Sequence, residues 1–203
     1  FELSVPGYPS TAAFFAAAAV LVPDSELMMN RILTNPTRTG FFTALEKMGA
    51  EVECIRQWEE AGELMGDLKI FHGPLNAITL TNQDIPGLID ELPIIAIIAT
   101  QAVGKTEVRG AKELRIKECD RIHAICTNLK KMGVDIKELD DGFIINGPTK
   151  LKGTQIETFH DHRIAMAFTV AGLIADGNVI LDYPECAFIS YPEFYDELDN
   201  LTI

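Results

Sequence analysis

The chain has 203 residues, of which 47% are hydrophobic, so it can bury a sizeable core; a disordered chain, a fibrous repeat and a small disulfide-stabilised fold are excluded. Thirty Asp and Glu against seventeen Lys and Arg give a formal net charge of −13, which disfavours nucleic-acid binding. Any anionic ligand therefore needs a local basic cluster. Four cysteines without a CxxC pair predict buried thiols in a reducing compartment, and we expect a cytoplasmic protein without a membrane partner because no long uncharged apolar run is present.

The predicted elements follow one order that recurs along the chain: a strand, an apolar helix, a strand and an amphipathic helix. The first set is predicted over 1–5, 11–22, 26–31 and 37–48. The second set lies over 77–81, 89–103, 105–109 and 115–132, followed by a hairpin over 134–139 and 142–146. The third set lies over 155–159, 162–175, 178–182 and 191–201. The three apolar helices have almost no polar face, so they belong in an interior.

A sequence repeat supports this order. The segment LEKMGAEV at 45–52 recurs 84 residues later as LKKMGVDI at 129–136, each time with a glycine that ends a helix and precedes a strand. We therefore predict a single α/β (α+β) domain over 1–203, with three units at about 1–73, 74–148 and 149–203 around a shared core of buried helices covered by sheets. The alternative, a doubly wound parallel sheet, is less favoured because its strands would be the most apolar segments.

The chain's basic residues are concentrated in one segment, between residues 105 and 121. The six cations are Lys105, Arg109, Lys112, Arg115, Lys117 and Arg121. In the helix predicted over 115–132, an apolar stripe faces the core and is formed by Ile116, Cys119, Ile122, His123, Cys126 and Leu129. Glu118 and Arg121 then share another side with Lys117, either as an ordinary helix ion pair or as part of an anion site.

Charged residues also open two of the apolar helices. Asp161 has the side chain of a helix cap, whereas Arg163 opposes the positive end of the helix dipole, a penalty that a bound anion would reverse. Asp90 begins the equivalent helix in the second unit, so we expect both aspartates at the same end of the domain. A carboxylate and an arginine at one rim suit phosphate binding with proton transfer. His160 and His162 lack the accompanying ligands of a metal site, and none is predicted.

Five motifs together resemble the 5-enolpyruvylshikimate-3-phosphate synthase family. They are VPG at 5–7, NPTRTG at 35–40, RIKECDR at 115–121, DHRIAM at 161–166 and SYPEFY at 190–195. The resemblance covers the whole chain but matches only the C-terminal of the family's two domains. It implies three βαβαββ units with buried parallel helices, and a partner N-terminal domain outside this sequence.

The resemblance also implies a reaction and the residues that perform it. The enolpyruvyl group of phosphoenolpyruvate is transferred to the 5-hydroxyl of shikimate 3-phosphate, with no metal or organic cofactor. Asp90 matches the aspartate near the reacting hydroxyl, Glu118 the proton-shuttling glutamate, and Lys117 a lysine near both. His162 matches an accessory proton-handling group.

The substrate-binding residues follow from the same motifs. Arg121 and Arg163 match the arginines that hold phosphoenolpyruvate. Asp161 and Arg115, which lie in the same two motifs, are also expected to bind substrate.

The sequence departs from the family at Tyr8, where the family has an aspartate, and at Ile189, where it has a lysine that helps bind phosphoenolpyruvate. The ligands supplied by the other domain are not in this sequence, so the chain alone is expected to be weakly active or inactive. Two alternatives stay open. One is a non-catalytic module of the same fold that binds an anion or a partner, and the other is a UDP-N-acetylglucosamine enolpyruvyl transferase domain.

Overall fold

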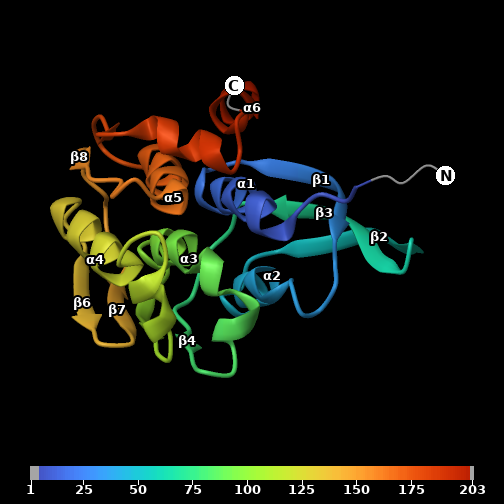
Figure 1. Ribbon diagram of the computed structural model, residues 1–203, viewed down its shortest axis with the longest axis horizontal. Coiled ribbons are helices and arrows are strands. Elements are labelled where there is room, and N and C mark those ends of the chain that lie inside the picture. Colours follow the sequence, from blue (N-terminus) through green and yellow to red (C-terminus); the bar gives the residue numbers. More distant parts are fainter. Residues whose placement is uncertain (1–4, 202–203) are drawn as a thin grey trace.

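Three helices form the centre of the domain in the computed structural model, which describes residues 5–201 (Figure 1). They are α1 (Pro9–Leu21), α3 (Leu92–Ala99) and α5 (His162–Gly172). Each contacts the other two, and all eight residues of α3 are buried. A helix that is apolar on every side can remove all of its apolar surface from water only in such a central position. The prediction of three buried helices is confirmed. The observed ends of the helices lie within a few residues of the predicted ones.

Within residues 5–201 the strands form three separate sheets around these helices rather than one continuous sheet. The first has the order β1 (Glu26–Leu33), β3 (Glu63–Phe71), β2 (Val52–Glu60), with antiparallel neighbours. The second has the order β4 (Thr79–Leu80), β5 (Gly104–Val108), β7 (Gly142–Gly147), β6 (Asp135–Leu139), in which β4 and β5 are parallel. The third pairs β8 (Gln155–Ile156) with β9 (Ile180–Leu181) in parallel. The doubly wound alternative is therefore wrong.

Three amphipathic helices complete the fold: α2 (Gly40–Lys47), α4 (Arg121–Lys131) and α6 (Phe194–Leu201). In the first two units the amphipathic helix packs on the hairpin that follows it, α2 on β2 and α4 on β6. In Figure 1, α6 lies at the edge of the molecule, above α1 and β1.

The sequence repeat is also a repeat of backbone hydrogen bonds. Gly49 and Gly133 have positive φ values of 91° and 89°. The residue after each glycine donates from its amide to the fifth residue before it, from Ala50 to Leu45 and from Val134 to Leu129, at 3.0 Å in both copies. This is the Schellman geometry that ends a helix and starts the next strand. The two copies therefore use the same physical device.

The helix predicted over 115–132 is wrong at its N-terminal end. Residues Lys112–Ile116 form a separate 3-10 helix, η3, and the chain bends until α4 begins at Arg121. The Asp120 side chain accepts a hydrogen bond from the His123 amide and fixes this start. The predicted apolar stripe is consequently wrong at Ile116, which is 82% exposed, and at His123, which is exposed as well.

Two other predictions concern the strand at the N-terminal end and the cysteines. The strand predicted over 1–5 falls almost entirely outside the described residues. The prediction of buried thiols is confirmed for Cys126 and Cys186, whereas Cys54 on β2 is exposed and Cys119 is intermediate. All four cysteines are free.

The helix-ending glycine of the second unit gives a test of the fold. We expect Gly133→Ala to lower the free energy of unfolding by about 1–2 kcal/mol, because a side chain disfavours the left-handed backbone. Space is not the cause, since an added Cβ at residue 133 meets only the flexible end of Lys152, at 3.7 Å. Urea denaturation measures the loss. Gly73→Ala is the control, because residue 73 has open space and lies outside the left-handed region; equal losses in both variants would contradict the explanation.

Candidate active site

Arg121 is the centre of a cluster of charged side chains at the start of α4. Its side chain is only 1% exposed and meets three carboxylates from different parts of the chain. Nε donates to Asp161 Oδ2 at 2.7 Å, Nη2 to Glu118 Oε2 at 2.6 Å and Nη1 to Asp90 Oδ1 at 3.1 Å. A buried guanidinium requires such partners, because an unpaired charge in the interior costs several kcal/mol.

Asp161 holds both Arg121 and the start of α5. Its carboxylate accepts from the backbone amides of Arg163 at 2.8 Å and Ile164 at 3.4 Å, so it is the helix cap that the sequence predicts. The preceding residues, Phe159 and His160, have φ values of 54° and 56°, a rare conformation for residues with side chains. Asp161 is fully buried and its carboxylate is occupied by Arg121 and by the start of α5, so the expected contact with substrate stays a prediction.

Asp90 lies where three cations converge. Besides Arg121, Lys117 Nζ is 3.6 Å from Oδ1 and Arg163 Nη2 is 3.6 Å from Oδ2. Burial on its own raises the pKa of Asp90, but attraction to Arg163, Lys117 and Arg121 outweighs it, and the net effect is a lowered pKa. We call Lys117, Arg121 and Arg163 the cation cluster.

The position of Asp90 differs from the expected one. It lies in a short 3-10 turn, Ile89–Glu91, so the N-cap of α3 is Glu91 rather than Asp90. The expectation that Asp90 and Asp161 meet at one end of the domain is nevertheless confirmed, since both bind Arg121. Arg163 is fixed at the same place, because its Nη1 donates to the carbonyl oxygen of Asp90 at 3.1 Å.

Glu118 and Lys117 reach the site from the bend before α4. The side chain of Glu118 is 48% exposed, so it is open to a ligand while it pairs with Arg121. The pair exists as predicted, but it is not a pair within one helix. His162, the first residue of α5, is half-buried, and burial lowers its pKa. Its imidazole is therefore neutral at neutral pH.

Three of the six cations in the predicted basic cluster lie elsewhere. Lys105 and Arg109 both bind Glu107, at 2.8 and 2.9 Å. Arg115 donates to Asp120 at 2.7 Å, to Glu138 at 3.0 Å and to the carbonyl oxygens of residues 139 and 140. Arg115 therefore fastens η3 to the β6–β7 hairpin, and the expectation that it binds substrate is not supported.

Sequence reasoning missed Glu91. Its side chain is 8% exposed and its Oε1 lies 3.6 Å from Arg163 Nη1. Burial raises its pKa, which the Ser10 hydroxyl and Arg163 counteract. The available signal was the acidic pair at 90–91 directly before an apolar helix, where the second carboxylate has to enter the interior.

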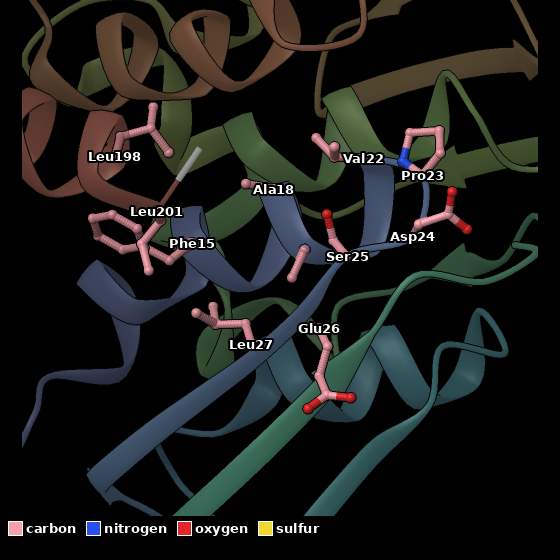
Figure 2. A pocket seen from close by; sticks show the side chains of 11 residues that line it. Phe15, Ala18, Val22, Pro23, Asp24, Ser25, Glu26, Leu27, Leu198 and Leu201 are labelled. Atoms are coloured by element: carbon pink, nitrogen blue, oxygen red, sulfur yellow. The ribbon is translucent and has the colours of Figure 1, made fainter. Parts of the chain in front are cut away.

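A cavity of about 470 Å³ lies in a different part of the domain, between α1, the start of β1 and α6. Figure 2 shows Leu198 and Leu201 of α6 near Phe15 of α1, so its lining is largely apolar. None of the charged residues described above lines it.

The structure also places the two departures from the motifs. Tyr8 is exposed and accepts a hydrogen bond at 3.3 Å from Arg38, whose guanidinium lies over the Tyr8 ring. Ile189 is 76% exposed at the end of a 3-10 helix, Pro184–Ile189.

Within residues 5–201, no group of three His, Cys, Asp or Glu side chains is placed to hold a metal ion. None of the helices described is long and apolar enough to cross a membrane.

Comparison with solved structures defines the class of fold. The chain superimposes on EPSP synthase from Acinetobacter baumannii with a TM-score of 0.93 and 36% identity, over 97% of this chain and 46% of that one. It also superimposes on the enolpyruvyl transferase NikO from Streptomyces tendae, with a TM-score of 0.76 and 18% identity over 98% of this chain, a likeness of fold alone. The chain therefore has the enolpyruvyl transferase fold.

Sequence comparison defines the family within that class. The sequence model of EPSP synthase (3-phosphoshikimate 1-carboxyvinyltransferase) matches residues 1–198, and the chain belongs to this family. It is 47% identical over 201 residues to the 3-phosphoshikimate 1-carboxyvinyltransferase of Persephonella marina, covering 98% of this chain, and 48% identical over 198 residues to that of Aquifex aeolicus, covering 97%. In both cases the match covers 46% of the relative. The chain thus spans about half the length of the curated relatives it matches.

The buried pair at the centre of the site gives a second test. We expect Arg121→Met to lower the free energy of unfolding by about 3–5 kcal/mol, because Asp161 then remains buried without its counter-charge. The double variant Arg121→Met, Asp161→Asn loses less than the sum of the two single variants, since the two groups interact directly. Chemical denaturation measures all three.

Arg109→Met is the matched control for this test. Its guanidinium is exposed and pairs with acids at the surface of the second sheet, so its replacement leaves the unfolding free energy nearly unchanged. Additive losses at 121 and 161 would show that the pair does not stabilise the site.

Proposed function

We propose that this chain is one half of an enzyme that transfers the enolpyruvyl group of phosphoenolpyruvate to the 5-hydroxyl of shikimate 3-phosphate. One observation carries the proposal: three cations from two separate segments converge on Asp90, within 3.1–3.6 Å. In a chain with a net charge of −13, so many cations around one carboxylate indicate a site for anions. The reaction needs both components, cations for phosphate and carboxylate groups and a base for a hydroxyl.

Phosphoenolpyruvate would bind to the cation cluster. Arg163 is fixed through Asp90 and through its own place in the first turn of α5, where Asp161 caps its backbone amide. Arg121 is oriented by Asp161, and a ligand would take the place of Asp90 or Glu118 at Nη1 or Nη2. Lys117 adds a positive charge on the more exposed side.

The carboxylates would move the protons. The cations keep Asp90 ionised at neutral pH, so Asp90 accepts the proton of the 5-hydroxyl as its oxygen attacks C2 of phosphoenolpyruvate. Glu118, which takes up a proton from solvent through its exposed side, gives this proton to C3 to complete a tetrahedral intermediate, and takes it back when the phosphate leaves and the double bond re-forms. The neutral imidazole of His162 is available to relay protons at the same place.

The second domain would supply the rest of the pocket. The chain covers about half of its relatives, so we propose that shikimate 3-phosphate is held mainly by residues outside this sequence, and that this chain alone is weakly active or inactive. A non-catalytic module that binds an anion or a partner is the second candidate. Tyr8 and Ile189, the two departures from the motifs, favour it.

Ligand binding tests the anion site directly. We expect phosphoenolpyruvate to bind this chain weakly at low salt, and Arg163→Gln to weaken binding by at least about tenfold because charged hydrogen bonds are lost. Isothermal titration calorimetry gives both affinities. Arg109→Gln serves as the control, since Arg109 binds Glu107 and Asp141 away from the site. Equal affinities of the unchanged chain and Arg163→Gln would count against the assignment.

Phosphate release tests the reaction itself. In this chain combined with a matching N-terminal half, we expect Glu118→Gln to lower kcat by roughly 10²–10⁴-fold, the usual contribution of a positioned acid or base. KM for phosphoenolpyruvate changes less, since the new amide oxygen at position 118 would still accept a hydrogen bond from Arg121. Glu157→Gln, which removes an exposed carboxylate paired with Lys131, is the control. No release above background from a folded pair would favour the non-catalytic module.

A further inference from the structure

Glu91 joins the starts of the three buried helices. It is the N-cap of α3, the Ser10 hydroxyl in the first turn of α1 lowers the pKa of its carboxyl, and it lies 3.6 Å from Arg163 in the first turn of α5. Asp90, the preceding residue, is also acidic, and its negative charge raises the pKa of Glu91. Arg38 lines the same small cavity of about 30 Å³, to which Ser10, Asp90 and Glu91 also contribute.

One oxygen of Glu91 has no hydrogen-bond partner among the described residues. Oε1 is fully buried and lies too far from Arg163 Nη1, at 3.6 Å, for a hydrogen bond. An ionised carboxylate in this position is stabilised only by the charge of Arg163, by the Ser10 hydroxyl and by the protein dipoles. A protonated carboxyl loses little here, because it carries no charge to be solvated.

The site holds more acids than bases. Its three cations, Lys117, Arg121 and Arg163, face four carboxylates, which belong to Asp90, Glu91, Glu118 and Asp161. A phosphate ester brings about two more negative charges. A dianion therefore enters a cluster that is already net negative, and this is unfavourable unless one of the carboxylates is neutralised.

The structure indicates which carboxylate that is. Asp161 accepts hydrogen bonds from Arg121 and from two backbone amides, so its carboxylate has partners on several sides. Asp90 has three cations within 3.6 Å, and Glu118 binds Arg121 at 2.6 Å while its side chain is half exposed. Of these four carboxylates, Glu91 alone combines burial with an unpartnered oxygen.

We propose that Glu91 is a positioning residue for Arg163, and that it takes up one proton from solvent when a dianionic phosphate compound occupies the cation cluster. The proposal rests on the anion site described under the proposed function. Before binding, the ionised carboxylate holds the Arg163 guanidinium at the helix starts. When the ligand supplies the negative charge, proton uptake at Glu91 removes the like-charge repulsion, and Arg163 is left to the ligand.

This proposal predicts how affinity depends on pH. Binding that takes up a proton weakens as pH rises, by up to about tenfold per pH unit. The direction agrees with the raised pKa of Glu91 in the free protein. The phosphate group of the ligand and His162 also titrate, but they do so in the same way when residue 91 is glutamine. The difference between the unchanged chain and Glu91→Gln therefore isolates Glu91.

The test is calorimetric titration of this chain with phosphoenolpyruvate in two buffers of different ionisation enthalpy, repeated between about pH 5 and about pH 8. We expect proton uptake by the unchanged chain and a smaller uptake by Glu91→Gln, whose affinity declines less with pH. Glu157→Gln, an exposed Glu-to-Gln change outside the site, behaves like the unchanged chain. Ser10→Ala removes the hydroxyl that favours the ionised carboxylate, so its pH midpoint shifts upward, and it supplies the test if Glu91→Gln folds poorly.

The outcomes separate this proposal from the one it rests on. Absence of any phosphoenolpyruvate binding by the unchanged chain would overturn both. Binding without proton uptake, or with uptake and a pH profile that are the same in Glu91→Gln, would overturn the role of Glu91 and leave the anion site in place. An unshifted midpoint in Ser10→Ala contradicts the role of Glu91 in the same way.

Discussion

The buried contact between Arg121 and Asp161 joins the second and third units and determines where the charged residues lie. Both side chains are almost completely shielded from water, so neither is stable without the other. Arg121 starts α4 and Asp161 caps α5, and the pair therefore fixes two helix starts against each other. Asp90 and Glu118 then accept hydrogen bonds from Nη1 and Nη2 of Arg121.

This arrangement explains how an acidic protein keeps a site for anions. The cation cluster is held in place by carboxylates on its inner side, Asp161 and Glu91, while Asp90 and Glu118 remain partly accessible. The inner carboxylates orient the arginines, and the accessible ones are available for proton transfer. The same acids outnumber the cations, so the affinity for an anion depends on how many of the carboxylates are ionised.

The repeated elements position the three buried helices, and the residues that differ between the repeats form the charged site. The three buried helices begin with N-caps of different character, Tyr8, Glu91 and Asp161. Of these three, only Asp161 caps its helix with its side chain. Glu91 instead turns toward Ser10 and Arg163, and Tyr8 stacks against Arg38. Three equivalent positions thus have three different roles, which a repeat of identical units would not provide.

The sequence by itself determined the three apolar helices, their order among the strands, and the glycine-terminated repeat, because these depend on local hydrophobic pattern and backbone preference. It also determined the family, through motifs that carry Lys117, Glu118, Arg121 and Arg163. Only the tertiary structure decided which cations gather. Lys105, Arg109 and Arg115 are near Arg121 in sequence but bind acids on the second sheet and its hairpin, whereas Arg163, 42 residues away from Arg121, joins the site. Helix packing decided the rest, because it buried Asp161 against Arg121 and placed the side chain of Glu91 in the interior.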